Sequence, residues 1–163
     1  MEVGFLQIFI LTMLKIIRTD STNPDFLQLV DELNAALAIR DGADYTFYAQ
    51  FNKIDKIQYV VVIYNSGKPV GCGAIKAYDE VTMEVKRMFV RQEVRGQGLG
   101  YAVLGALELW ARELNYNRCV LETGKKQPEA ISLYKKAGYQ TIPNYGQYAG
   151  VDNSICFEKK LLK

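Results

Sequence analysis

The stretch that decides the fold runs from Met83 to Gly100 and reads MEVKRMFVRQEVRGQGLG. Its first part, residues 83–90, is largely apolar and contains β-branched valines, which is typical of a buried strand. Three glycines at every second position then lead directly into residues 101–114, where apolar residues recur at helical spacing. The sequence therefore predicts a strand, a glycine-rich loop and the start of a helix, in that order.

A loop of this kind can bind a phosphate group. The first backbone N–H groups of a helix have no partner within the helix, and the positive end of the helix dipole lies behind them. Glycines let the backbone approach a ligand closely and adopt positive φ angles. Arg95, at the start of the loop, adds a positive charge.

Two common phosphate motifs do not fit this loop. A Walker loop ends in Gly-Lys-Ser/Thr, which is absent here. A dinucleotide fingerprint, Gly-x-Gly-x-x-Gly, would need a glycine where the chain has Tyr101. The loop also allows a plainer interpretation, a tight strand-to-helix turn whose glycines serve packing only.

The spacing that does fit is Arg-x-x-Gly-x-Gly, formed by Arg95, Gly98 and Gly100. It resembles the pyrophosphate loop of the GCN5-related N-acetyltransferases, the GNAT family, which bind acetyl-coenzyme A (acetyl-CoA). A second pattern of that family, Asn-x-x-Ala-x-x-Leu-Tyr-x-x-x-Gly-Phe/Tyr, is matched by Gln127, Ala130, Leu133, Tyr134, Gly138 and Tyr139. At its first position Gln127 replaces the usual asparagine and keeps the amide with a longer reach.

The resemblance implies a fold and a co-substrate. The fold is α/β, with a mixed, mostly antiparallel central sheet, helices on both faces and one splayed strand pair, in a single domain over residues 1–163. The co-substrate is acetyl-CoA, and no metal is expected. By their place in the motifs and the preceding strand, the residues expected to bind acetyl-CoA are Met88, Phe89, Val90, Arg95, Gly96, Gln97, Gly98, Leu99, Gly100 and Gln127.

Acetyl transfer to an amine needs a base, a donor to the thioester carbonyl and an acid for the leaving thiolate. In the resembled family a backbone N–H near Val90 serves the carbonyl. Tyr134 is the expected acid by its position in the family motif, although it also lies on an apolar helix face that suits a core residue. Glu84, on the central strand shortly before the carbonyl-binding segment, is the expected base; a water chain and Glu122 are the alternatives.

Four aromatic residues are candidates for the wall of an acceptor pocket, Phe47, Tyr48, Tyr145 and Tyr148. Each of them alone is equally explained by packing. The acceptor class stays open between a small amine, an amino-acid-like amine and a peptide amine, and no acidic cluster in the sequence favours a polyamine. A non-catalytic acyl-CoA-binding module is the alternative function.

Composition narrows the chemistry further. The chain has no histidine, so histidine-dependent triads, dyads and metal sites are excluded, and the base must be another group. A net charge of +2 without a basic run argues against a nucleic-acid partner. Three widely spaced cysteines in apolar segments predict buried thiols in a reducing, cytoplasmic setting rather than disulfides.

Strand and helix patterns alternate along the rest of the chain. Helices are expected from Asn23-Pro24 to just before Asp41 and over 127–138, with an aromatic-rich connection over 43–57 that forms either a short helix or a lid. Strands are expected over 14–18, 58–64, 70–78, 118–123, 139–142 and 154–161.

The strand over 83–90 carries an irregularity of its own. Val81, Met83 and Val85 share one parity, whereas Met88 and Val90 share the other. One extra residue near Lys86-Arg87, a β-bulge, would place both sets on one face. In the resembled family a bulge here splays this strand from the next, and the pantetheine arm enters the gap.

The first 13 residues are an apolar extension that is too short to span a bilayer and lacks the marks of a signal peptide. No membrane association is expected from them. Three interpretations remain open: a strand at a sheet edge, a strand in a homodimer, or an upstream start.

Overall fold

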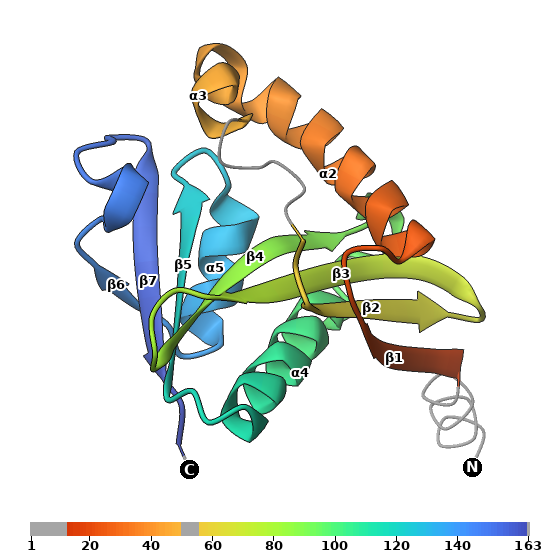
Figure 1. The fold of residues 1–163 in the computed structure, drawn as a ribbon. Coiled ribbons are helices and arrows are strands. Elements are labelled where there is room, and N and C mark those ends of the chain that lie inside the picture. The colour runs from red at the N-terminus through yellow and green to blue at the C-terminus, as the bar shows by residue number, and fades with distance from the viewer. Residues whose placement is uncertain (1–12, 50–55, 163) are drawn as a thin grey trace.

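The computed structural model describes residues 13–49 and 56–162. In that part of the chain seven strands form one sheet with the order β1-β2-β3-β4-β5-β7-β6 (Figure 1). The strands are β1 (Leu14–Thr19), β2 (Tyr59–Asn65), β3 (Lys68–Ala77), β4 (Thr82–Val90), β5 (Arg118–Gly124), β6 (Gln140–Ile142) and β7 (Ser154–Lys160). The helices are α2 (Pro24–Asp41), α3 (Tyr45–Ala49), α4 (Leu99–Glu113) and α5 (Pro128–Lys136). All neighbouring strands are antiparallel except β4 and β5, which run parallel.

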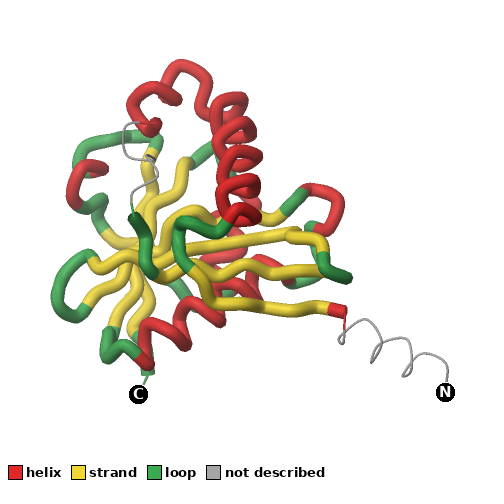
Figure 2. The backbone as a smooth tube through the Cα atoms, turned by 45° about the vertical axis from the view of Figure 1, so that its right-hand side comes forward, coloured by secondary structure: helices red, strands yellow, loops and turns green. Residues whose placement is uncertain are grey.

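Helices cover both faces of the sheet, as expected, and the tube in Figure 2 shows the strands as one twisted layer between them. One face carries α4 and α5, and its core includes Val103, Leu107 and Phe157. The opposite face carries α2, whose Phe26 and Leu29 pack into a separate cluster. The mixed α/β architecture is therefore confirmed.

Strand β2 shows why its sequence is a continuous apolar run. Val60 and Val62 point into the α2 core, whereas Val61 and Ile63 point into the α4 core. Successive side chains of a strand alternate between faces, so a strand that is covered on both sides needs apolar residues at every position.

The start of α2 is fixed by a side-chain cap. The Asn23 side chain accepts hydrogen bonds from the backbone N–H groups of Asp25 and Phe26, at 2.9 and 3.0 Å, and Pro24 occupies the first helical turn. Both features satisfy or remove donors that the helix itself cannot pair. The helix start predicted from the sequence is confirmed.

The bulge predicted in β4 is present at Arg87, whose φ of 59° is in the left-handed region. Opposite it, Cys72 of β3 pairs with Phe89 while Ala74 pairs with Lys86, so β4 has one residue more than β3 over this interval. Gly73 faces the bulge: a Cβ at this position would lie 2.5 Å from Met88 Sδ, 2.8 Å from Leu107 Cδ1 and 3.0 Å from Val103 Cγ1. Any larger residue there would have to displace side chains of both β4 and α4.

Beyond Glu84 the two parallel strands separate. Pairing between β4 and β5 covers Thr82–Glu84 and Arg118–Val120, although β4 continues to Val90 and β5 to Gly124. This divergence is the predicted splayed pair, and it opens the central part of the sheet (Figure 1).

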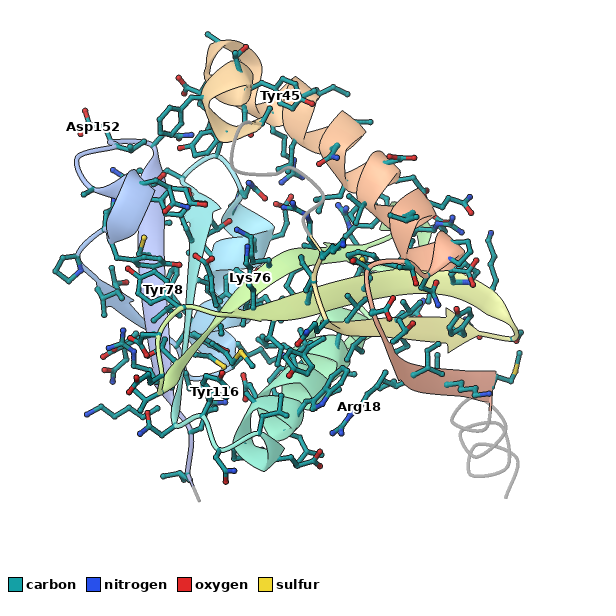
Figure 3. All side chains as sticks on the ribbon, in the orientation of Figure 1. Arg18, Tyr45, Lys76, Tyr78, Tyr116 and Asp152 are labelled. Carbon is teal, nitrogen blue, oxygen red and sulfur yellow. The ribbon has the colours of Figure 1, made fainter. Side chains whose placement is uncertain are left out.

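Arg18 of edge strand β1 contacts helix α4. The Arg18 guanidinium lies over the Trp110 ring, 4.7 Å from its centroid, and pairs with Glu113 (Figure 3). A cation over an aromatic face is attracted by the ring quadrupole. The contact supports a strand that has no further strand on its outer side within the described residues.

The connection after α2 contains the short helix α3, one of the two interpretations of residues 43–57. Part of that connection, residues 50–55, and the N-terminal extension over residues 1–12 lie outside the described residues. Among the helices that the structure describes, none is long and apolar enough to cross a membrane. The three cysteines are buried and unpaired, as predicted.

Candidate active site

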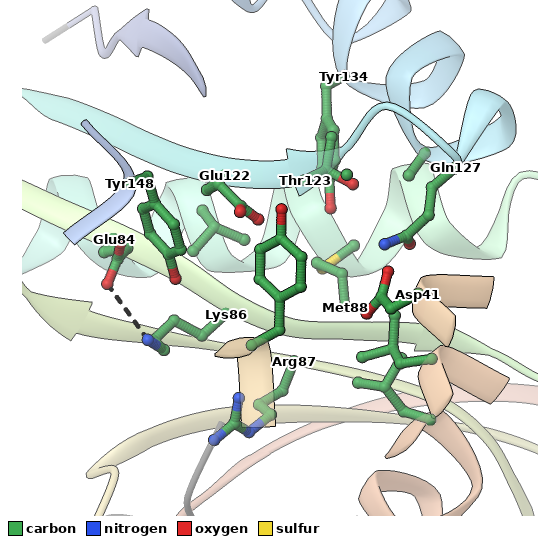
Figure 4. A pocket seen from close by; sticks show the side chains of 16 residues that line it. Asp41, Glu84, Lys86, Arg87, Met88, Glu122, Thr123, Gln127, Tyr134 and Tyr148 are labelled. Atoms are coloured by element: carbon green, nitrogen blue, oxygen red, sulfur yellow. Dashed lines mark hydrogen bonds and ion pairs between the residues drawn. The ribbon is translucent and has the colours of Figure 1, made fainter. Parts of the chain in front are cut away.

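A cavity of about 120 Å³ lies where β4 and β5 diverge. Its walls come from α2, α3, β4, β5, α5 and the turn that precedes β7. Figure 4 shows polar side chains of these elements around one space. The polar or charged residues of the wall, tyrosines apart, are Asp41, Glu84, Lys86, Arg87, Glu122, Thr123 and Gln127.

The glycine loop has the backbone geometry that an anion site needs. Gly96 and Gly98 have φ angles of 82° and 79°, which L-residues with a Cβ rarely adopt, and the space where a Cβ would stand is open at both. Gly98 is the N-cap of α4 and offers no side-chain cap, so the first N–H groups of α4 remain available to a ligand.

Arg95 and Gly100 hold this loop in place. Arg95 Nε donates a 2.9 Å hydrogen bond to the Val90 carbonyl, which keeps the guanidinium at the loop. A Cβ on Gly100 would lie 3.3 Å from the Leu133 Cδ2, so a small residue lets α4 and α5 approach each other. Glycine and arginine therefore serve both packing and the anion site.

Tyr134 reaches the cavity from α5. Its ring is buried between Tyr139 and Phe157, at centroid distances of 5.9 and 6.1 Å, which matches the core interpretation. Its hydroxyl nevertheless points into the cavity beside Thr123 (Figure 4). Burial raises the pKa of Tyr134 well above its usual value, so the hydroxyl keeps its proton and can act as a donor.

Glu84 lies in the same cavity but is already engaged. It accepts a 2.6 Å hydrogen bond from the Tyr145 hydroxyl and forms an ion pair with Lys86 Nζ at 3.4 Å (Figure 4). Each carboxylate oxygen of Glu84 therefore already has a protein partner.

Glu122, on β5, has a different environment. Burial raises its pKa to about 7, and the negative charges of Asp41 and Glu84 add to this effect. A 2.7 Å hydrogen bond from Ser154 Oγ acts in the opposite direction. A carboxyl group that titrates near neutrality is suited to general base chemistry.

Behind Glu122 runs a chain of hydrogen bonds. Ser154 has a single hydroxyl hydrogen, and it is used toward Glu122; hence the 3.0 Å contact between Tyr48 and Ser154 has Tyr48 as the donor. Asn153 Nδ2 in turn donates to the Tyr48 hydroxyl at 3.3 Å. The chain fixes the orientation of the carboxylate from three elements.

Comparison with known proteins agrees with this geometry. The model of the acetyltransferase (GNAT) family matches residues 25–139. This chain belongs to the GNAT acetyltransferases. It is 35% identical over 138 residues to a protein of Azospirillum brasilense named IAA acetyltransferase, covering 83% of this chain and 90% of that protein.

Solved structures give the same result for the fold. A Klebsiella pneumoniae structure assigned to the acyl-CoA N-acyltransferases superposes with a TM-score of 0.78 at 31% identity, over 92% of this chain and 99% of that chain. A GNAT acetyltransferase of Elizabethkingia anophelis, solved with acetyl-CoA bound, superposes with a TM-score of 0.65 at 18% identity. The superposition covers 91% of this chain and 99% of that chain. At that identity the second likeness concerns the fold alone.

The residues that the sequence assigned to acetyl-CoA lie in two places of this GNAT acetyltransferase. Met88 and Gln127 line the cavity, and Phe89 and Val90 complete the end of β4. Residues 95–100 form the loop and the first turn of α4. The first group thus lies at the cavity where β4 and β5 diverge, and the second lies in the loop that follows the end of β4.

The four aromatic candidates do not share one role. Tyr48 and Tyr148 line the cavity. Tyr145 packs edge-to-face against Tyr148, with 5.9 Å between the ring centroids, and its hydroxyl donates a hydrogen bond to Glu84. Phe47 packs against Tyr48, with 5.3 Å between the ring centroids. The structure thus places two of them in the wall and two behind it.

Two residues of the site, Ser154 and Asp41, carry no sequence signal for it. Their signal is spatial, because both act on Glu122, which lies far from each of them in the chain. Lys86 differs, since it pairs with Glu84 only two positions away, a pairing that the strand sequence allows. Within the described ranges, no group of three or more Cys, Asp or Glu side chains is arranged to hold a metal ion.

Proposed function

We propose that this acetyltransferase transfers the acetyl group of acetyl-CoA to a primary amine by direct attack. Glu122 takes the proton of the amine, and Tyr134 donates a hydrogen bond to the leaving thiolate, which then takes its proton from solvent. The observation that carries the proposal is that both side chains face one cavity in the gap between β4 and β5.

The chain offers a continuous place for acetyl-CoA. The N–H groups at the start of α4, with Arg95, suit the pyrophosphate, and the gap beyond Glu84 suits the pantetheine arm. The protein of Elizabethkingia anophelis that shares this fold binds acetyl-CoA. The thioester would then lie in the cavity, beside Met88 and Tyr134.

In the reaction the amine nitrogen attacks the thioester carbonyl carbon, a C–N bond forms and the C–S bond breaks. The proton that leaves the nitrogen passes to Glu122, whose pKa of about 7 lets it be ionised and still basic near neutral pH. The thiolate formed has a reference pKa of roughly 8.5. Tyr134, protonated because of its burial, is the donor that stabilises it.

Of the two candidate bases, the contacts favour Glu122 over Glu84. Both carboxylate oxygens of Glu84 already have protein partners, Lys86 Nζ and the Tyr145 hydroxyl, whereas burial raises the pKa of Glu122 to about 7. The expected role of Glu84 is to keep Lys86 in place and to add negative charge near Glu122.

The test is release of the coenzyme A thiol from acetyl-CoA across a panel of amines, amino acids and short peptides, with thermal unfolding followed alongside. We expect acetyl-CoA to raise the unfolding temperature and one amine class to give turnover. A protein that acetyl-CoA does not stabilise would contradict the phosphate site. Stabilisation without turnover on any amine would contradict the transfer reaction.

A further inference from the structure

The wall of the cavity contains a carboxylate, Asp41, that has no hydrogen-bond or ion-pair partner among the described residues. Asp41, the last residue of α2, is only 3% exposed. Its side chain caps no backbone group, and none of the residues in 13–49 and 56–162 forms a hydrogen bond or ion pair with it. Figure 4 shows its carboxylate directed into the cavity, on the side of Met88 and Gln127.

This position is unfavourable for a negative charge in the protein alone. The carbonyl groups at the C-terminus of a helix carry partial negative charge, and a carboxylate there is repelled. Burial without a hydrogen-bonding partner adds a desolvation cost, and it raises the pKa of Asp41.

The two lysines near Asp41 form ion pairs with other carboxylates. Lys126 is the cation whose charge acts most on Asp41, but its Nζ pairs with Asp44 at 3.8 Å. Lys86, in the same cavity wall, pairs with Glu84. Asp41 is therefore placed to receive a positive charge from a ligand.

The three carboxylates of the cavity differ in what they can do for an amine. Glu84 is neutralised by Lys86, and Glu122 is suited to take the proton of the reacting nitrogen. Asp41 forms no ion pair with any residue in 13–49 or 56–162, and the Lys126 charge acts on it only from a distance. Asp41 is suited to pair with an ammonium group that stays positively charged throughout the reaction. The reacting nitrogen is not such a group, because it must become neutral before it attacks.

We propose that Asp41 binds a second, non-reacting ammonium group of the acceptor, so that the preferred substrates are short α,ω-diamines. The proposal rests on the proposed function, since it names the acceptor class of that same site. The cavity, about 120 Å³, corresponds to the volume of roughly four water molecules, which suits a short aliphatic chain.

The experiment compares amines that have the same number of non-hydrogen atoms. The pairs are 1,3-diaminopropane with n-butylamine and 1,4-diaminobutane with n-pentylamine. We expect the wild-type protein to prefer the diamine in kcat/KM by roughly 10- to 100-fold, the effect of one hydrogen bond to a charged group. Asp41→Asn should lose this preference. Because the charge of Asp41 also raises the pKa of Glu122, the quantity compared is the ratio of diamine to monoamine kcat/KM within each variant, not an absolute rate.

Asp44→Asn is the matched control, because Asp44 lies three residues further, half exposed, and pairs with Lys126. It should keep the preference. Asp41→Asn removes a buried unpaired charge, so it should fold at least as well as the parent; Asp41→Ala provides a second variant. An unchanged preference in both Asp41 variants, whatever their absolute rates, overturns the proposal.

Calorimetric titration of the coenzyme A-saturated protein with 1,3-diaminopropane separates the two proposals. Binding that depends on Asp41 supports the acceptor site even if no amine is acetylated, in which case the proposed function alone fails. Loss of coenzyme A affinity in Asp41→Asn, with the amine preference retained, would assign Asp41 to the acetyl-CoA side and overturn the inference.

Discussion

Ser154 Oγ on β7 donates a 2.7 Å hydrogen bond to Glu122 Oε2 on the neighbouring strand β5. The bond stabilises the ionised carboxylate, whereas burial favours its protonated form, and the balance leaves the pKa of Glu122 at about 7. A residue 32 positions away in the sequence thus adjusts the group that we propose as the base.

Glu122→Gln should lower kcat/KM roughly 10²- to 10⁴-fold, because a positioned base contributes about this much. In the parent, kcat/KM should fall as the pH drops through about 7, since protonated Glu122 cannot accept a proton. The variant should lack this acid limb, as measured by thiol release between pH 5.5 and 9. Glu84→Gln is the control and should retain the limb; loss of the limb in Glu84→Gln instead would make Glu84 the base.

Ser154→Ala should move the acid limb to higher pH by roughly one pH unit, because the lost hydrogen bond had lowered the pKa of Glu122. The rate above the limb should change little. The comparison variant is Ser132→Ala, at an exposed position of α5. If the Ser154→Ala profile coincides with that of the parent, the hydrogen bond does not control the base.

The same raised pKa has a consequence for stability. Glu122 titrates near 4.5 in the unfolded chain and near 7 in the folded protein, so its contribution is fully present below pH 4.5 and is lost as the pH rises through 7. Glu122→Gln should therefore be more stable than the parent at pH 8 by roughly 1–3 kcal/mol, with the difference vanishing near pH 4.5. Urea unfolding at the two pH values measures this. A difference that is independent of pH would mean that Glu122 does not titrate with folding.

Tyr134→Phe should lower kcat by roughly 10²-fold while leaving acetyl-CoA affinity nearly intact, because only the donor to the thiolate is removed. Single-turnover thiol release and calorimetric titration report the two quantities. Tyr139→Phe is the matched control: Tyr139 is also buried, but its hydroxyl donates to Glu108 outside the cavity, at 3.0 Å. It should lose stability and keep kcat. Equal kcat in Tyr134→Phe and the parent would remove the acid role.

Gly98→Val should abolish detectable acetyl-CoA binding. The φ of 79° at Gly98 strains any residue with a Cβ, and a β-branched side chain would also stand where the ligand must approach the N–H groups of α4. Gly105→Ala, within α4 and with open space around its Cβ position, should bind normally and be slightly more stable. Unchanged affinity in Gly98→Val would contradict the pyrophosphate site.

Local signals were sufficient for most of the fold. The Asn23 cap, the apolar run of β2 and the parity change in β4 act over a few residues, so each could be identified from neighbouring positions. The glycine loop belongs to the same class, because positive φ angles at Gly96 and Gly98 follow from residue type.

The chemistry of the cavity depended on tertiary structure. The sequence showed both Glu84 and Glu122 as carboxylates on strands, without a way to tell them apart. Only folding brings Tyr145 onto Glu84, across 61 positions, and Ser154 onto Glu122. Asp41 likewise reads in the sequence as an ordinary helix end, and only the fold places it in the cavity wall, 3% exposed and with no ion-pair partner among the described residues.

By itself the sequence determined the order of elements, the bulge, the glycine turn before α4 and the family, since these rest on backbone preferences and short-range patterns. The tertiary structure alone decided the surroundings of each carboxylate: the partners of Glu84, the burial that raises the pKa of Glu122, and the position of Asp41 in the cavity wall. The physical reason is that a pKa depends on burial and on charges within a few ångströms, and residues from α2, β4, β5 and β7 reach those distances only in the folded chain.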